Sequence, residues 1–411
     1  MPDAGRIICI AGAGIAGMTL ALTLAKFGAR IFLIEREPAI QEFGAGLQIS
    51  PNARRVLSRL GLDRAIHEVS FEPAGIDVYA AQREKHLITL RLGDEAERRF
   101  GAPYAVMHRQ DLAEVLHRAC KRFANIDFMF GARSFSAEET GKGVSVQVDE
   151  ADGNTRNLRA FALIGADGVH SRTRTVLMGA PLASSTGLVA WRVLLKISDV
   201  GGLIPTDRTS LFLGRGWHLV AYPLPHRGQV NIALFLENTA NAGAEPPLNP
   251  LFSRNHKLGA RVEAIMTLAS GHWGRWPLNN VSLPSWHKGS IGLIGDAAHA
   301  MLPFQAQGAA MGIEDAAVLA PLLMTEESAD AAFSRYEDLR RARVERVTRI
   351  SRSNGQIYGL GTPLAVGRDL VIRLGGPTAH LKRLDWLYRY DAAPEIATGN
   401  TQATPALGTR R

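Results

Sequence analysis

The chain has 411 residues, of which 46% are hydrophobic and 21% are charged. This length and composition are typical of a folded protein with more than one domain, and they exclude a largely disordered chain. The formal net charge is +8, but the basic residues are scattered, and their densest run, residues 335–349, alternates with Glu and Asp. We interpret that run as a solvent-exposed helix face with i,i+4 pairs, and we expect anionic small ligands rather than nucleic acid.

The cysteines and the N-terminus indicate the compartment. Cys9 lies in an apolar strand and Cys120 in an amphipathic helix, and neither has the spacing of a metal ligand, so we predict two buried thiols and no metal site. A glycine-rich turn interrupts the first apolar run, which argues against a signal peptide or a membrane span. We therefore expect a cytoplasmic protein.

The first 35 residues predict a βαβ unit. Its parts are a buried strand over 6–11, the turn 12-GAGIAG-17, a helix over 15–27 and a second strand over 30–35. Gly12 permits the tight turn, Gly14 lets the backbone approach a pyrophosphate, and Gly17 lets the helix pack closely on the strand. Glu35 ends the second strand where a ribose-binding carboxylate belongs, which favours FAD or NAD over NADP.

The middle of the chain changes character. Amphipathic helices are predicted over 51–62 and 108–123, antiparallel strands over 74–92, a hairpin and a buried strand over 143–168, and further strands over 188–197, 210–214, 217–224 and 229–237. Residues 238–250 are loop-like, the chain after 291–294 is mostly helical to about Tyr390, and 392–411 has the composition of a disordered tail. A parallel nucleotide-binding region is thus interrupted by antiparallel sheet and resumes near Ile291.

After the chain returns to the nucleotide-binding region, a second stretch of small residues, 295-GDAAHAMLPFQAQGAAMG-312, could let the backbone lie close to a ligand. Asp296 directly follows a strand and can accept a hydrogen bond from a sugar-like hydroxyl. The small residues over 306–312 place backbone N–H groups at a helix start, which suits negative charge on a reduced flavin. FAD accounts for both stretches, because its ADP half lies on the first and its flavin half on the second, whereas NAD needs only the first.

A third stretch, 161-FALIGADGVHSRTR-174, places Asp167, Ser171, Arg172 and Arg174 just after a buried strand. We expect the arginines to lie beside a phosphate site.

Together these three stretches resemble the single-component FAD-dependent aromatic hydroxylases, the group A flavoprotein monooxygenases. The resemblance covers nearly the whole chain and is greatest to the salicylate, 3-hydroxybenzoate and 6-hydroxynicotinate hydroxylases. It implies an α/β fold similar to that of p-hydroxybenzoate hydroxylase, with a Rossmann-like FAD-binding domain, an inserted antiparallel β-sheet substrate domain and C-terminal helices. The implied divisions are an FAD-binding domain (1–70, 105–180 and 280–325), a substrate domain (71–104 and 181–279), a helical region (326–391) and the tail (392–411).

The resemblance also implies the cofactor-binding residues. They are Gly12, Gly14, Ile15, Ala16, Gly17, Glu35, Arg36, Gln48, Arg109, Asp167, Asp296, Pro303, Gly308 and Ala309. Arg109 would reach the ribityl chain or the pyrophosphate, Asp167 would serve both FAD and the nicotinamide coenzyme, and Pro303 would pack near the ring where oxygen reacts. Ala310 and Met311 depart from the Asn or Cys of many relatives, which we expect to tune the flavin pocket.

The implied reaction uses NADH or NADPH to reduce FAD, and O2 to form a C4a-hydroperoxide that hydroxylates an electron-rich ring. Catalytic candidates are His218, Tyr222 and Pro303. By the two-residue period of a strand, His218, Val220 and Tyr222 share one face, which in the family covers the substrate. His218 suits a phenol proton, although it could equally be a core histidine.

The predicted substrate pocket consists of Leu47, Tyr104, His218, Tyr222, Phe304 and Gln305. We interpret His299 as mainly structural, and Arg192 as either a partner for a substrate carboxylate or a structural ion-pair residue. The expected partners are a small aromatic substrate and O2, without nucleic acid or membrane, in a monomer or homodimer.

Two alternatives remain from the sequence. One is an FAD monooxygenase or epoxidase acting on a larger polycyclic substrate. A halogenase is disfavoured, because 273-WGRWPL-278 matches the WxWxIP pattern of halogenases only in part. The other is a non-hydroxylating flavin redox protein.

Overall fold

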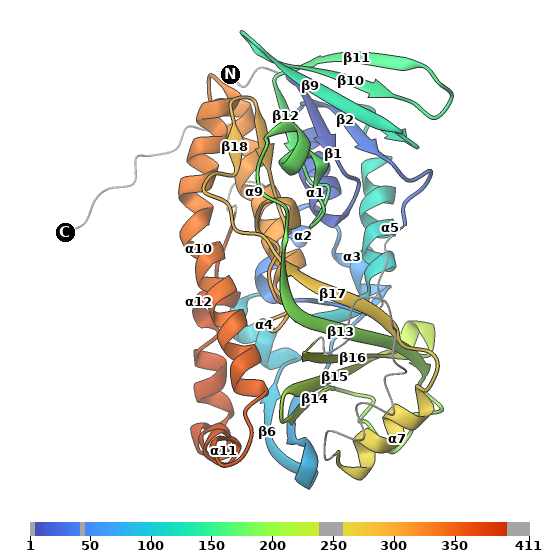
Figure 1. The fold of residues 1–411 in the computed structure, drawn as a ribbon, viewed down its shortest axis with the longest axis vertical. Helices are drawn as coiled ribbons and strands as arrows, with labels where there is room; N and C mark the ends of the chain where they lie inside the picture. Colours follow the sequence, from blue (N-terminus) through green and yellow to red (C-terminus); the bar gives the residue numbers. More distant parts are fainter. Residues whose placement is uncertain (1–4, 42–45, 238–257, 393–411) are drawn as a thin grey trace, which may run out of the picture.

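The computed structural model describes residues 5–41, 46–237 and 258–392 (Figure 1). One of its two large sheets has six strands in the order β18-β19-β12-β1-β2-β8. The strands are β1 (Ile7–Ala11), β2 (Arg30–Glu35), β8 (Ile126–Phe130), β12 (Ala162–Gly165), β18 (His287–Lys288) and β19 (Ile291–Leu293). Neighbouring strands are parallel except for β18 and β19. The chain therefore rejoins its first sheet at Ile291, as the sequence predicted.

The two faces of this sheet enter different cores, because successive side chains of a strand point to opposite sides. Ile8 and Ile10 of β1 pack with helices, whereas Cys9 and Ala11 pack under a three-stranded antiparallel sheet. The helices are α1 (Ile15–Lys26), α2 (Pro51–Arg59), α5 (Arg109–Cys120) and α9 (Gly308–Thr325); the small sheet is β9 (Ser134–Thr140), β10 (Gly143–Asp149) and β11 (Thr155–Ala160). The predicted hairpin is confirmed, with β9 as an additional strand.

Two features of this core bear on the expected compartment. Both cysteines are buried and free, and burial raises the pKa of each thiol to about 12. Helix α9 is long and apolar enough to span a membrane, but 78% of it is buried inside the protein, so it packs as a core helix.

The second large sheet has seven strands in the order β17-β13-β16-β15-β14-β5-β6. Its strands are β5 (Gly75–Ala80), β6 (Lys85–Arg91), β13 (Ser184–Lys196), β14 (Thr209–Gly214), β15 (Trp217–Leu224), β16 (Gln229–Glu237) and β17 (Gly274–Asn280). On β15, Trp217, Leu219 and Ala221 pack toward α7 (Ala260–Leu268). His218 and Val220 therefore face the opposite side, where they join clusters that include residues of the 302–304 segment.

The remaining elements connect these sheets. They are β3 (Gly46–Ile49), β4 (Ser70–Phe71), β7 (Ala105–His108), α3 (Asp63–His67), α4 (Asp94–Phe100), α8 (Asp296–His299), a π-helical turn (Thr173–Leu177), α10 (Ala329–Tyr358), α11 (Leu364–Lys382) and α12 (Asp385–Tyr388). Helix α10 has 30 residues and runs along the side of the molecule past both large sheets (Figure 1). Its first turn is capped by the Ser328 hydroxyl, which accepts a hydrogen bond from the N–H of Ala331.

The predicted fold class, a parallel nucleotide-binding sheet with an inserted antiparallel sheet and C-terminal helices, is confirmed. The exact domain boundaries remain predictions. The expected loop over 238–250 and nearly all of the expected tail lie outside the described residues. The sequence did not predict α3, α4, α7, α8, β3, β4, β7, β8, β9, β17 or β18, most of which are short or lack a clear apolar period.

Candidate active site

The N-terminal glycine turn is built for close approach. Gly12 has a positive φ of 106°, and a Cβ there would lie 2.5 Å from the carbonyl oxygen of Ala166. A Cβ on Gly17 would lie 2.0 Å from the carbonyl oxygen of Gly12, so any side chain would separate the helix from the turn. Glu35 accepts hydrogen bonds from the N–H groups of Ala13 and Glu37 at 2.8 and 3.0 Å. This turn, with no acidic residue in the first turn of α1, fits the pyrophosphate and ribose of FAD.

The second stretch meets the first at Ala16. Cβ atoms built on Gly295 and Gly312 would lie 3.2 and 2.9 Å from the Ala16 methyl, so both glycines let the second stretch pack against the start of α1. Asp296 is the one exposed residue between Ile291 and Ala300. Its carboxylate is also the nearest group to a Cβ built on Gly308, the first residue of α9, at 3.9 Å.

This arrangement fits the flavin half of FAD. A carboxylate that can accept from a ribityl hydroxyl lies beside a helix N-terminus whose first turn carries no acidic residue. The loop that leads into α9 contains Ala306 with a φ of 53°, a left-handed conformation that is uncommon outside glycine and concentrates at functional sites. Ala310 and Met311 are fully buried in the core, so their departure from the family pattern alters the packing behind this loop.

The third stretch differs from the expectation. Arg174 was expected beside a phosphate, but it is fully buried and donates hydrogen bonds to the carbonyls of Val169, Pro181 and Ala297. It anchors this loop to α8, and its role is structural. Asp167 accepts from the Ser171 hydroxyl and from the N–H and hydroxyl of Thr173. Its carboxylate shapes its own loop, and a role with FAD or the coenzyme stays a prediction.

Two more of the predicted cofactor residues lie at the edges of the site. Arg36 has a side chain that is 82% exposed and pairs with Glu37 at 3.2 Å, so it lies at the surface beyond Glu35. Arg109 is the first residue of α5 and is half-buried. Their contacts with FAD stay predictions.

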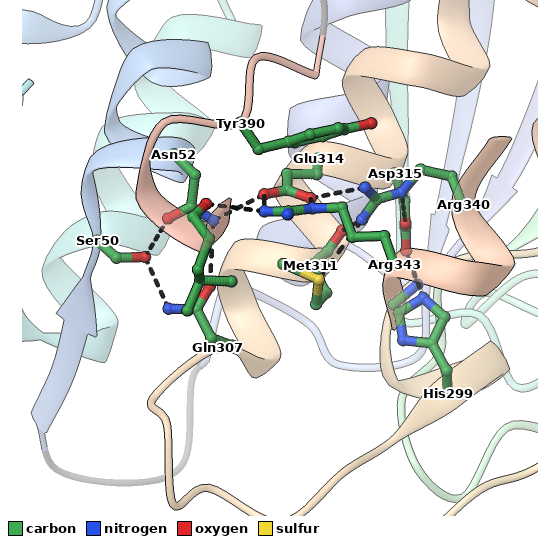
Figure 2. Close-up of polar contacts among 12 residues, drawn as sticks. Ser50, Asn52, His299, Gln307, Met311, Glu314, Asp315, Arg340, Arg343 and Tyr390 are labelled. Carbon is green, nitrogen blue, oxygen red and sulfur yellow. Dashed lines mark hydrogen bonds and ion pairs between the residues drawn. The ribbon is translucent and has the colours of Figure 1, made fainter. Parts of the chain in front are cut away.

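Behind the second stretch lies a buried polar network, which Figure 2 shows. Asp315 of α9 accepts hydrogen bonds from the N–H of Gly295 at 2.9 Å, from His299 at 2.6 Å and from Arg340 at 2.9 Å. Burial alone would raise the pKa of Asp315, but His299, Arg340 and the bond from Gly295 outweigh it and lower the pKa to about 2. His299 is therefore structural, as predicted.

The neighbouring carboxylate extends the network to the flavin loop. Glu314 pairs with Arg340 at 2.6 Å and with Arg343 at 2.7 Å, and it accepts from the amide of Asn52 at 2.7 Å. Asn52 and Ser50 in turn bond Gln307, the N-cap residue of α9. The exposed face expected over 335–349 is therefore wrong for Arg340, which is fully buried in this double ion pair.

A cavity of about 710 Å³ lies between the seven-stranded sheet and α10. Two of the predicted pocket residues, His218 and Phe304, line it. The His218 ring stacks on Phe235 at 4.7 Å and meets the rings of Phe304 and Tyr358 edge-on at 4.8 and 5.2 Å. Burial lowers the pKa of His218 to about 3, so the imidazole is neutral near pH 7.

The other predicted pocket residues do not line this cavity. The Tyr104 hydroxyl donates to Gln48, and burial raises the pKa of Tyr104. Tyr222 is also buried: its hydroxyl would lie 2.2 Å from a Cβ built on Gly46, and burial raises its pKa. Leu47 lies next to Gly46 on β3, and Gln305 has a buried side-chain oxygen with no hydrogen-bond partner among the described residues.

Arg192 lies near Tyr222 and Arg109. Its Nε is buried without a hydrogen-bond partner in the described part of the chain, and the guanidinium lies 5.9 Å from the Trp276 ring. Burial lowers the pKa of Arg192; Tyr222 opposes this and Arg109 adds to it. Burial of a cation is costly unless another group pairs with it, and no such pairing of this Nε is found among the described residues.

Sequence reasoning missed Phe235 and Tyr358, whose rings contact the His218 ring, and the small residues of α10 that line the cavity. A glycine inside an otherwise long helix, as at Gly355, was the signal that could have indicated a close contact.

Comparison with known proteins identifies the class. An FAD binding domain family model matches residues 7–351. The chain belongs to this FAD-binding family. It is 31% identical over 393 residues to 3-hydroxybenzoate 6-hydroxylase 1 of Aquipseudomonas alcaligenes, covering 93% of this chain and 97% of that one. It is 32% identical over 358 residues to 6-hydroxynicotinate 3-monooxygenase of Bordetella bronchiseptica, covering 84% and 91%.

The fold comparison agrees. A salicylate hydroxylase substrate complex matches with a TM-score of 0.76 and 25% identity, over 98% of this chain and 100% of that one. The family resemblance drawn from the sequence is therefore confirmed, and the protein is an FAD-dependent monooxygenase.

The glycine turn gives a direct test of the FAD site. In Gly17→Ala the new methyl would overlap the Gly12 carbonyl, so we expect FAD affinity to fall by at least about tenfold. Gly141→Ala is the matched control, because a Cβ there meets nothing within 4 Å. The measurement is FAD dissociation followed by flavin fluorescence, with circular dichroism to confirm folding. A folded Gly17→Ala protein that retains FAD as tightly as wild type would contradict the site.

The buried network gives a stability prediction. Asp315→Asn leaves His299 and Arg340 without their shared carboxylate, and we expect a loss of about 3–5 kcal/mol in the free energy of unfolding. Since the folded-state pKa of Asp315 is about 2, below its ordinary 3.8, its contribution is present above pH 4 and is lost as the pH falls toward 2. Urea unfolding across this range should show that loss in wild type and a smaller one in the variant. Asp338→Asn, at an exposed position of α10, should match wild type.

Proposed function

We propose that the protein hydroxylates a small aromatic acid or phenol with O2, using NADH or NADPH to reduce its FAD. The observation that carries this proposal is the cavity whose wall joins His218 of the substrate sheet to Leu302 and Phe304 of the stretch that fits the flavin. The relatives named above act on hydroxybenzoate and hydroxynicotinate, which are aromatic acids of this kind. The oxygen chemistry, which we expect to run through a flavin C4a-hydroperoxide, is supplied by the cofactor.

The protein's part is to orient the ring and exclude water. The wall formed by His218, Phe235 and Phe304 is apolar and aromatic, which suits stacking or edge-on contact with a substrate ring. Burial keeps His218 and Tyr222 in their neutral forms. His218, in the cavity wall, is therefore suited to hold a phenol by a hydrogen bond more than to carry a charge. Their roles as catalytic groups, and that of Pro303, stay predictions.

Arg192 is the residue we assign to the substrate's acid group. It lies beyond the cavity's lining residues, four positions along β13 from Leu188, which lines the cavity, and on the same face of the sheet. Its Nε is buried with no hydrogen-bond partner among the described residues, which supports an anionic ligand, and Tyr222 beside it offers a neutral hydroxyl. A guanidinium holds a carboxylate more strongly in a buried site than in water.

A larger polycyclic substrate stays the second candidate, because a cavity of about 710 Å³ lies in the range of sites that take drug-sized ligands. A cytoplasmic location, monomer or homodimer state, and function without membrane or nucleic acid complete the proposal.

The first measurement is oxidation of NADH and NADPH by the FAD-loaded protein against hydroxybenzoates, hydroxynicotinates and larger phenols, with product and H2O2 both quantified. We expect one ring class to accelerate coenzyme oxidation and to give hydroxylated product with little peroxide, because a fitting substrate excludes water from the flavin. Slow oxidation or free peroxide with every single-ring compound would contradict the assignment to small aromatic substrates.

The variant Arg192→Met tests whether the guanidinium binds the acid group of the substrate rather than its ring. We expect KM for a hydroxylated aromatic acid to rise roughly 30-fold or more, while KM for the matching phenol without a carboxylate changes little. Arg192→Lys should recover part of the loss, because it keeps the charge but not the fork of donors. An equal rise in KM for the acid and the phenol would show that Arg192 does not bind the carboxylate.

A further inference from the structure

We propose that Gly355 of α10 is a specificity-determining residue, which sets the ring size that the substrate cavity accepts by seating the Phe304 side chain. The inference rests on the proposed function, since it deepens the choice of substrate at that cavity. Its basis is a set of contacts between the C-terminal part of α10 and the segment Leu302–Phe304.

Three hydrogen bonds fix that segment to α10. The Ser351 hydroxyl donates to the carbonyl oxygen of Leu302 at 2.6 Å and accepts from the N–H of Phe304 at 3.2 Å. The amide of Asn354 donates to the carbonyl oxygen of Phe304 at 3.3 Å. Ser351 is fully buried, so these bonds are shielded from water. The backbone of Phe304 is thus held on α10, and its ring must occupy whatever space the helix leaves.

Gly355 leaves that space. A Cβ built there would lie 2.4 Å from both Cδ2 and Cε2 of the Phe304 ring, well inside van der Waals contact. The backbone of Gly355 is helical, with no positive φ, so its conformation does not require glycine. Alanine is the better residue inside a helix, and the packing of Phe304 is the physical reason for glycine here.

The Phe304 ring lies between α10 and aromatic side chains of the seven-stranded sheet. Phe304 meets His218 edge-on at 4.8 Å and Phe235 edge-on at 5.4 Å, and all three residues line the cavity. Because interiors are close-packed, a methyl group at position 355 displaces the ring toward the open volume. The cavity then becomes smaller at the wall that holds a substrate ring.

The ligand class follows from the volume and the wall. With Phe304 seated, the cavity of about 710 Å³ exceeds what one ring needs, so it admits a hydroxylated aromatic acid with two fused rings as well as one with a single ring. One methylene in an apolar pocket changes discrimination by roughly tenfold or more, which makes position 355 a sensitive control of ring size.

The test compares binding and turnover of hydroxynaphthoates and hydroxybenzoates in the FAD-loaded protein. Affinity is measured by the change that the ligand causes in the flavin absorbance spectrum, and turnover by hydroxylated product and H2O2. We expect Gly355→Ala to lower affinity and kcat/KM for the two-ring acids by roughly tenfold more than for the single-ring acids. Gly367→Ala, a helical glycine of α11 whose Cβ would meet nothing within 4 Å, should leave the ratio unchanged.

A second variant tests the hydrogen bonds that hold the Leu302–Phe304 segment on α10, without adding volume to the side chain. Ser351→Ala removes two of the three bonds to Leu302–Phe304, so we expect the two-ring to single-ring ratio to move toward one and the H2O2 yield to rise. Ser353→Ala, at an exposed position of the same helix, is its control. A general loss of folding would change neither the ratio of affinities for two-ring and single-ring acids nor the share of coenzyme oxidation that ends in H2O2.

Several outcomes overturn the proposal. One is that wild type binds no two-ring acid; another is that Gly355→Ala weakens both ring classes equally or neither. Ring-size selectivity in binding with no hydroxylated product from any ring would instead refute the proposed function and leave the role of Gly355 standing.

Discussion

Two adjacent buried carboxylates on α9, Glu314 and Asp315, are the constraint on which the site depends. Neither is exposed, and a buried charge is tolerated only where opposite charges and donors surround it. Their partners come from three separate parts of the chain: Gly295 and His299 at the two ends of α8, Asn52 in the first turn of α2, and Arg340 and Arg343 of α10. Satisfying these two carboxylates therefore fixes the second glycine stretch relative to everything around it.

Helix α10 serves both halves of the site. Through Arg340 and Arg343 it supports the loop that fits the flavin, and through Ser351 and Asn354 it holds the segment at the wall of the cavity. A rigid helix carries both sets of contacts about three turns apart, since an α-helix has about 3.6 residues per turn. One helix therefore holds both the loop that fits the flavin and the segment at the cavity wall.

Local chemistry made the first part of the site predictable. The glycine turn, Glu35 and Asp296 each follow a strand in a pattern whose geometry is set by neighbouring residues, and the structure has them at the ends of β1, β2 and β19. The two-residue period of β15 likewise placed His218 opposite the α7 face. In contrast, Arg174 and Arg340 were misjudged because their partners lie far along the chain or are backbone carbonyls. Composition alone does not distinguish a solvated arginine from one buried among carboxylates. Tyr104 and Tyr222 were placed in the pocket from family likeness, whereas the cavity boundary depends on how α10 packs.

The burial of the two cysteines bears on how a flavin monooxygenase resists oxidation by its own peroxide. A flavin monooxygenase that meets a poorly fitting ring releases peroxide beside its own side chains, and thiolates are the groups that peroxide attacks most readily. Cys9 lies between a sheet and its covering strands, and Cys120 lies at the end of α5 with its sulfur near the Met18 carbonyl. With a pKa of about 12, both stay protonated and out of contact with solvent. The packing that completes the nucleotide-binding core thus also keeps both thiols away from peroxide released at the flavin.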